Sequence, residues 1–285
     1  MSIIFWFRRD LRLQDNEALA AALAATRQQA SQMYLIAVAN QVEFEKLLPI
    51  RQHSLVESLK ALDRSLQGKL NTGLGEPAEV LANFAGLTKA SAVFAMRSFD
   101  PIGITEQNVV GQALAQAGVT LKLIGSAYAV TPGSVSKPDG SPYRVYTPFY
   151  RAWLEIGWPP PIRIEIDFSA LEKMDGYSQL PEPAGPAAIK VIAGESFALR
   201  TLERFSKRAL SKYDEDRNRA DLSGTSHLSH ALSHGEIHPR TILATLGQSK
   251  AQEVFRKEIA WREFYADVLW HNPHSLNDYY EPRFA

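Results

Sequence analysis

Short apolar runs alternate with amphipathic helical patterns over the first 130 residues, and this alternation limits the fold more than any other feature of the sequence. The first run, residues 3–7, has no polar residue, as expected of a central parallel strand covered on both faces. Asp15 or Asn16 can cap the helix that follows. The same patterns predict strands at residues 33–38, 92–96 and 120–124, and helices near residues 51–66 and 106–117. We therefore predict an α/β fold with a doubly wound, Rossmann-like parallel sheet.

The rest of the chain divides into two parts. From residue 131 to 195 helical periodicity disappears and six prolines fall between Pro159 and Pro186, so we expect an extended connector rather than a core element. Further helices are predicted at residues 197–213, 226–233, 239–246 and 250–270. The predicted organisation is an α/β domain (1–130), a connector (131–195) and an all-α region (196–285).

Charge and cysteine content exclude several functions. Lys and Arg (31) balance Asp and Glu (31), so a nucleic-acid surface would have to be a local patch. The absence of cysteine excludes disulfides, thiolate metal sites and cysteine nucleophiles, and it fits a reducing cytoplasm, where we expect the protein. No secretory signal pattern is apparent, and no apolar run approaches the roughly 20 residues of a membrane span. We expect no membrane partner.

The stretch GLGEPA, residues 73–78, matches the relaxed dinucleotide fingerprint G-x-G-x-x-A. The residues before it are not predicted to form a strand, and the first strand–helix unit has no such glycines. Pro77 is better explained as the first turn of a helix after a glycine turn. The stretch is therefore not predicted to be an NAD site.

Four histidines are spaced three, four and four residues apart, so on one continuous helix they could bind a metal: His227, His230, His234 and His238. Gly235 and Pro239 interrupt such a helix, and there is no H-E-x-x-H motif. A zinc-dependent hydrolase stays an alternative, but we favour solvated or locally hydrogen-bonded histidines and predict no metal site.

Two later segments carry unusual polar groups. Around Gly224 the hydroxyls of Thr225, Ser226 and Ser229 and the free N–H groups of a helix start could cradle a diphosphate, although a simple helix cap would explain them too. Further on, a carboxylate, an indole, a guanidinium and a phenol share one helical stripe: Glu258, Trp261, Arg262 and Tyr265. Such groups can contact bases and phosphates, whereas a packing helix would carry aliphatic residues there.

These stretches together resemble the DNA photolyase and cryptochrome family. The resemblance rests on IIFWFRRDLRLQDNEAL from Ile3, PYRVYTPFYRAW from Pro142, Tyr213 with Arg217 and GTSHLSHALSHGEIHPR, and EIAWREFY from Glu258. The motifs occur in this order over essentially the whole chain, which makes the match far more specific than any one of them.

The resemblance implies light-driven repair of cyclobutane pyrimidine dimers by electron transfer from reduced FAD to a flipped-out dimer. It assigns FAD contacts to six residues: Tyr213, Thr225, Ser226, His227, Leu228 and Ser229. It places Glu258 and Trp261 against the dimer as the catalytic pair. It assigns DNA contacts to Arg217, Glu258, Trp261, Arg262 and Tyr265. The expected partner is dimer-containing DNA, bound by a monomer.

Three departures from the family pattern matter. His227 stands where the family cradle usually has arginine. Residues 98–110 lack the asparagine–glutamate pair of a folate antenna, so a folate or deazaflavin antenna is not identified. The family's helical domain continues well beyond EIAWREFY, so we expect this chain by itself to bind FAD weakly or not at all. A cryptochrome-like photoreceptor without repair activity is the alternative within the same family.

The N-terminal arginine cluster follows the first strand directly. Arg8, Arg9, Asp10 and Arg12 are predicted to lie in the loop at its carboxyl end, where open parallel sheets place their clefts. In the resembled family this loop faces the crevice between domains. We therefore favour an interdomain lock of ion pairs and hydrogen bonds over a phosphate site.

Overall fold

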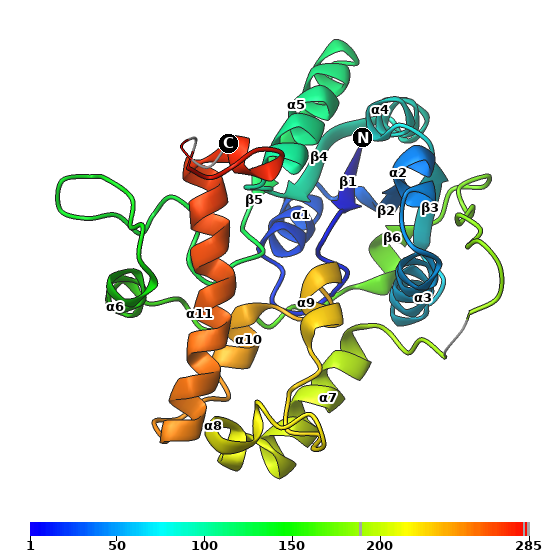
Figure 1. Cartoon of the computed structure of the whole chain (residues 1–285). Helices are drawn as coiled ribbons and strands as arrows, with labels where there is room; N and C mark the ends of the chain where they lie inside the picture. Colours follow the sequence, from blue (N-terminus) through cyan, green and yellow to red (C-terminus); the bar gives the residue numbers. More distant parts are fainter. Residues whose placement is uncertain (188–189, 282, 284–285) are drawn as a thin grey trace.

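The computed structural model describes residues 1–187, 190–281 and 283 of the chain. Its centre is a parallel sheet in the order β3-β2-β1-β4-β5 (Figure 1). The strands are β1 (Ser2–Phe7), β2 (Gln32–Ala39), β3 (Leu70–Leu74), β4 (Ala90–Met96) and β5 (Thr120–Ile124), and β6 (Leu171–Glu172) pairs with the first half of β2. Since β1 lies in the middle and the strand order reverses beside it, the crevice at its carboxyl end is the expected place for a site.

Helices cover both faces of the sheet. Ile3, Phe5 and Phe7 pack with α1 (Glu17–Gln28) and α3 (Pro49–Ser65), while Ile4 and Trp6 pack with α4 (Pro77–Thr88) and α5 (Pro101–Gln116). The short α2 (Gln41–Glu45) precedes α3. Strand β1 is thus buried on both sides, and the predicted doubly wound α/β fold is confirmed.

The stretch before GLGEPA forms strand β3, so the prediction that it is not a strand was wrong. Asn71 and Gly73 are poor strand formers, which hid the pattern. Asn71 is nevertheless fully buried, because its side-chain amide donates to Leu35 O (2.9 Å) and accepts from Met174 N (2.8 Å). Helix α4 starts at Pro77 as expected.

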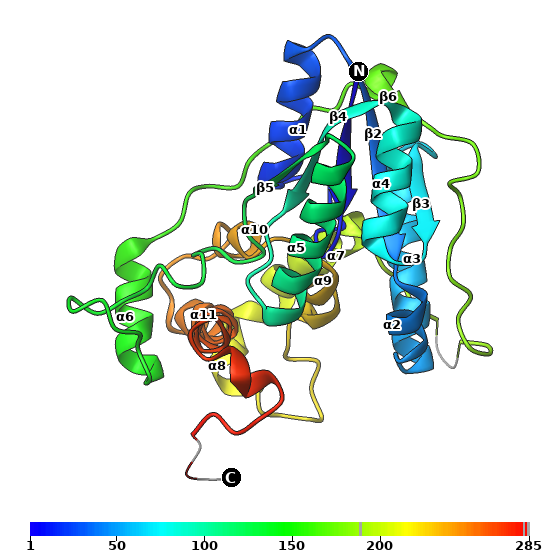
Figure 2. The same cartoon turned by 90° about the horizontal axis from the view of Figure 1, so that it is seen from above.

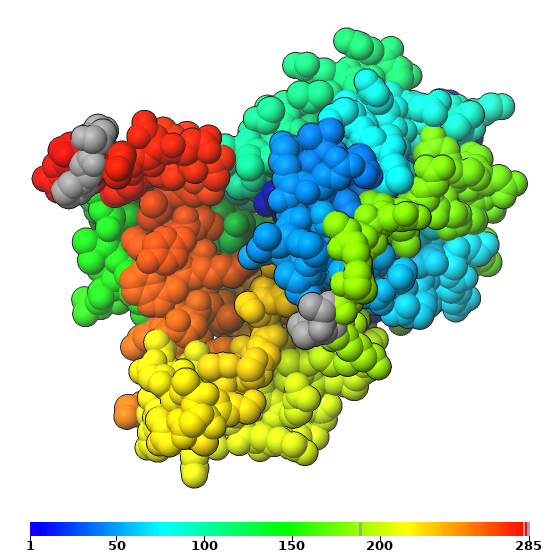
Figure 3. Space-filling model, turned by 45° about the vertical axis from the view of Figure 1, so that its right-hand side comes forward, coloured from blue at the N-terminus to red at the C-terminus, as the bar shows by residue number. Residues whose placement is uncertain are grey.

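The connector is not a simple extended linker, and this prediction was also wrong. It contains α6 (Tyr146–Ile156), the 3-10 turn η1 (Phe168–Ala170) and β6. Trp153 on α6 is fully buried in the core of the helical region, and Leu171 is buried beside the sheet. The connector's first half therefore belongs to the helical core, and its second half runs over the α/β domain, as the light-green atoms in Figure 3 show.

The helical region follows the predicted order with different boundaries. It comprises α7 (Glu195–Arg208), η2 (Leu210–Lys212), α8 (Tyr213–Asp216), α9 (Ser229–His234), α10 (Pro239–Leu243), α11 (Lys250–His271) and η3 (Pro273–Leu276). The predicted helix at 197–213 breaks at Ala209, and α9 starts late because His227 has a left-handed backbone (φ 53°). Helix α11 is confirmed, and the capping box of Ser249 and Gln252 fixes its start.

One buried carboxylate joins the connector to α11. Glu263 accepts hydrogen bonds from Ala129 N (2.5 Å), Val130 N (3.0 Å) and the Trp153 indole (2.6 Å). These bonds hold helix α6 and the chain at the start of the connector against α11. Helices α6 and α11 lie on the same side of the molecule in Figures 1 and 2. Within the part of the chain that the structure describes, no helix combines the length and apolar character that a membrane crossing requires.

Candidate functional site

The N-terminal arginine cluster divides between two roles. Arg8 donates to Glu106 (Nε to Oε2, 3.0 Å) and to Gly103 O (2.9 Å), and Arg9 pairs with Asp100 (3.2 Å), so both arginines are engaged within the α/β domain. They do not form the predicted interdomain lock. Because both arginines are already paired with carboxylates, they also argue against a phosphate site in this loop.

Arg12 does cross between the domains. Its guanidinium donates to Gly235 O (3.2 Å), and the neighbouring Leu11 N donates to His234 O (3.1 Å). Gly235 has φ 68°, and a Cβ there would lie 1.9 Å from the Arg9 carbonyl oxygen, so only glycine fits. For Arg12 the predicted lock is confirmed.

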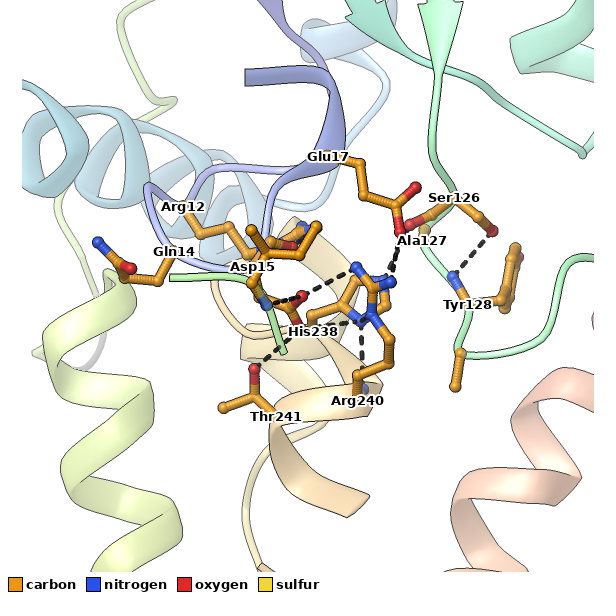
Figure 4. Close-up of polar contacts among 12 residues, drawn as sticks. Arg12, Gln14, Asp15, Glu17, Ser126, Ala127, Tyr128, His238, Arg240 and Thr241 are labelled. Atoms are coloured by element: carbon orange, nitrogen blue, oxygen red, sulfur yellow. Dashed lines mark hydrogen bonds and ion pairs between the residues drawn. The ribbon is translucent and has the colours of Figure 1, made fainter. Parts of the chain in front are cut away.

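The main interdomain ion pair involves residues that the sequence analysis missed. Arg240 pairs with Asp15 (2.8 Å) and with Glu17, and Asp15 also accepts from the Thr241 hydroxyl (3.1 Å), as Figure 4 shows. His238 donates from Nε2 to Ser126 O (2.9 Å) and accepts from Arg240 N at Nδ1 (3.1 Å). Burial, then the nearby arginines, hold the pKa of His238 well below its usual value, so the ring is neutral and structural.

The histidine row does not form a metal site. His227 lies outside any helix, His238 faces the domain interface, and only His230 and His234 share α9. Within the described residues no group of three or more His, Cys, Asp or Glu side chains could hold a metal ion. The histidine row therefore does not supply the metal site on which the zinc-hydrolase alternative depends.

The residues of the predicted stripe all lie on α11, and Arg217 contacts one of them. Arg217 donates to Glu258 (Nη1 to Oε1, 2.5 Å), and its guanidinium carbon lies 5.8 Å from the centroid of the Tyr213 ring. Both members of the ion pair are about one third exposed, at 30% and 35% of their side-chain surface. A carboxylate held in place but still reachable from solvent can form hydrogen bonds with a ligand.

Trp261 lies against an aromatic residue of the connector. Its ring stacks on Tyr146 with centroids 3.6 Å apart and planes 8° apart, and the Tyr146 hydroxyl donates to Lys257 O (2.8 Å). Tyr265 stacks on the same indole more loosely, at 5.6 Å and 26°, and is 63% exposed. Tyr146 belongs to the PYRVYTPFYRAW motif, but sequence reasoning gave it no role because its partner is 115 residues away.

Arg262 points toward the domain crevice. It donates to Ala127 O (3.0 Å), and its guanidinium carbon lies 4.6 Å from the centroid of the Tyr128 ring. Arg262 and Ser229 line the same cavity of about 430 Å³ at the carboxyl end of β4. The structure thus brings one predicted DNA residue together with one predicted cofactor residue.

The remaining cradle residues line a different hollow. Thr225, Ser226 and His227 face a space of about 400 Å³ beside α7, whereas Leu228 is buried in the core. Tyr213 is only 7% exposed and packs edge-on against Phe255. The hydroxyls and nearby cations fit the diphosphate of FAD, while the Tyr213 ring mainly supports the core.

Comparison with known proteins identifies the family. The model of the DNA photolyase family matches residues 3–165, more than half of the chain, and the chain belongs to this family. A deoxyribodipyrimidine photo-lyase of Synechococcus sp. PCC 6301 is 31% identical over 97% of this chain and 62% of its own length. The crystal structure of a bacterial class III photolyase from Agrobacterium tumefaciens superimposes with a TM-score of 0.84 and 28% identity, covering 99% of this chain and 62% of that one.

The chain therefore spans about three fifths of the length of these photolyases. A 31.6 kDa protein of Synechococcus sp. PCC 6716 is more similar to this chain in length. It is 30% identical, and the match covers 92% of this chain and 98% of that protein.

Proposed function

We propose that this chain takes part in the light-driven repair of cyclobutane pyrimidine dimers in DNA. The observation that supports this most is the solvent-reachable Glu258, held by Arg217 one helical turn from Trp261. This arrangement presents a hydrogen-bonding carboxylate and a stacking surface side by side. The relatives named as deoxyribodipyrimidine photo-lyases support the same activity.

Each residue has a separate part in the proposal. FAD, when bound, supplies light-driven electron transfer, and Thr225 and Ser226 would hold its diphosphate, whereas Ser229 faces the other cavity. Glu258 would accept or donate a hydrogen bond at the edge of an extruded base, oriented by Arg217. Trp261 would stack on the base and keep it out of the duplex, and a damaged pair costs less to unstack than an intact one.

Binding of a thymine-dimer oligonucleotide to Trp261→Ala tests the stacking role. We expect the dimer affinity to fall about fivefold or more, because base–aromatic stacking contributes about 1–3 kcal/mol. Trp270→Ala is the matched control, since Trp270 lies on the same helix but contacts Phe99 edge-on. An equal loss in both variants would contradict the role of Trp261.

Repair is tested by illuminating protein and FAD, under reducing conditions, with the same oligonucleotide. We expect blue light to restore intact thymines and Glu258→Gln to slow repair. Flavin binding and a light response without repair would favour the cryptochrome-like photoreceptor instead.

A further inference from the structure

A continuous series of aromatic rings, called the aromatic chain below, runs from Trp261 into the connector. Trp261 stacks on Tyr146 with centroids 3.6 Å apart, and Tyr146 lies 5.8 Å from Tyr150 on the next turn of α6. Tyr150 lies 6.0 Å from Trp153, which lies 4.4 Å from Trp158. Because the sequence has no cysteine, indoles and phenols are the side chains of this protein that lose one electron most readily.

The aromatic chain is buried in its middle and reaches the surface at both ends. Trp153 is fully buried and Tyr150 is 6% exposed. Trp261 and Trp158 are half-buried at the edge of the helical core. The chain therefore connects the proposed DNA-facing surface to a second point on the surface of the molecule.

Tyr150 has a proton acceptor in place. Its hydroxyl donates to Glu253 Oε1 (2.7 Å), and Arg256 (2.6 Å) and Lys257 (3.7 Å) pair with the same carboxylate. Burial raises the pKa of Glu253, but the hydrogen bonds from Tyr150 and Arg256 outweigh it and leave the pKa below its ordinary value, so the carboxylate is ionised at neutral pH. A phenol that loses an electron also gives up its proton, and an acceptor at this distance can take it.

A second carboxylate lies against Trp153. The indole donates to Glu263 Oε2 (2.6 Å), and both side chains are buried. A negative charge so close, in surroundings of low dielectric constant, stabilises positive charge on an oxidised indole. Each of the two innermost rings of the chain thus has a carboxylate at its polar atom.

We propose that the aromatic chain reduces an oxidised guanine in DNA that contacts Trp261, with Tyr150 as the electron donor and Glu253 as the proton acceptor. Guanine is the base that loses an electron most readily, so an electron vacancy in DNA settles there. The inference goes beyond dimer repair and requires no flavin. It rests on the proposed function in one respect, because Trp261 has to face DNA.

The electrons and protons of this reaction balance. The guanine radical cation takes one electron from Trp261 and becomes guanine. Tyr150 returns an electron to Trp261 through the Tyr146 ring, and its proton moves to Glu253. A thiol at the surface end of the chain then supplies one electron to Tyr150, and Glu253 returns the proton. The thiol is released as a thiyl radical and a proton.

A photo-oxidant attached to the protein tests the aromatic chain without DNA. Because the sequence has no cysteine, Tyr265→Cys gives a single attachment point beside Trp261 for a ruthenium polypyridyl complex. Electron paramagnetic resonance after flash oxidation detects the radical. We expect a tyrosyl radical whose yield falls about tenfold or more in Tyr150→Phe and in Glu253→Gln, because the donor or its proton acceptor is lost.

Tyr177→Phe is the control for this measurement. It removes a phenol that packs beside Phe84, outside the aromatic chain, and accepts a hydrogen bond from Asn83 (3.1 Å). We expect its radical yield to equal that of the labelled parent. An unchanged yield in Tyr150→Phe or in Glu253→Gln overturns the inference.

An oligonucleotide with the same ruthenium complex tethered near a guanine tests the reaction with DNA. We expect the wild-type protein to shorten the lifetime of the guanine radical in transient absorption, and Tyr150→Phe to restore it. No shortening, in a protein whose labelled form makes the Tyr150 radical, overturns oxidised guanine as the substrate. A chain that makes this radical but binds no dimer-containing DNA contradicts the repair function and leaves the electron path standing.

Discussion

At the scale of single residues, the stack of Tyr146 on Trp261 links the connector to the proposed dimer site. The planes are nearly parallel and 3.6 Å apart at their centroids, and the Tyr146 hydroxyl is tied to the backbone of α11. The pKa of Tyr146 is raised by burial and by neighbouring Tyr150 and Glu258, so the hydroxyl remains a donor at neutral pH. Tyr146 therefore limits the angles that the indole can adopt.

Replacing this ring tests whether it positions Trp261. We expect Tyr146→Leu to weaken binding of a dimer-containing oligonucleotide by about 1 kcal/mol, the usual contribution of an aromatic pair, with undamaged DNA unaffected. Tyr146→Phe keeps the stack and should retain dimer selectivity. Fluorescence anisotropy with the two oligonucleotides measures the effect. Equal weakening for both DNAs would mean that Tyr146 only stabilises the fold.

At the scale of elements, α11 anchors the connector through a buried carboxylate. Glu263 accepts from two backbone N–H groups and one indole, and burial, the largest influence, raises its pKa. A charge buried in this way persists only because three donors surround it. The position of α6, and hence of Tyr146, depends on these bonds.

Glu263→Gln tests the anchor. We expect a loss of about 2–3 kcal/mol in the free energy of unfolding, because a glutamine turns an NH₂ group toward donors and leaves one buried donor unpaired. Glu258→Gln is the matched control on the same helix. Its partly exposed ion pair predicts a loss below about 1 kcal/mol. Urea unfolding measures both, and equal losses would argue against a special role for Glu263.

At the scale of the whole molecule, two neutral histidines lie where the α/β and helical parts meet. Burial, then His230 and Arg51, lower the pKa of His234 to about 4, and the pKa of His238 is also lowered. In the unfolded chain both would titrate near 6.5, so the unfolded state binds more protons between about pH 6.5 and 4. Stability contributed by these histidines is therefore present above pH 6.5 and lost on acidification.

The pH dependence of unfolding tests this arrangement. We expect the free energy of unfolding to fall from pH 7 to pH 5, by up to about 1.4 kcal/mol per pH unit for each histidine. Asp10, Glu195 and Glu263 oppose part of this fall, because burial raises their pKa values. His234→Gln should flatten the slope relative to the wild type. Identical slopes would contradict a contribution from His234.

The sequence by itself determined the elements whose signal is local. Residues 3–7 predicted a central strand because they are apolar without interruption, and α11 followed from its helical periodicity. The stripe of Glu258, Trp261 and Tyr265 could also be predicted, because helical spacing alone places these side chains on one face. The family followed from motifs in order, and the family model confirms it.

Only the tertiary structure decided the features that depend on partners far along the chain. Strand β3 forms despite Asn71 and Gly73 because the Asn71 side chain bonds to β2 and to the connector. Helix α6 packs beside α11 because its Trp153 and Tyr146 contact Glu263 and Trp261 of that helix. Arg240 meets Asp15 across 225 residues of sequence. Such contacts come from packing, and no local pattern encodes them.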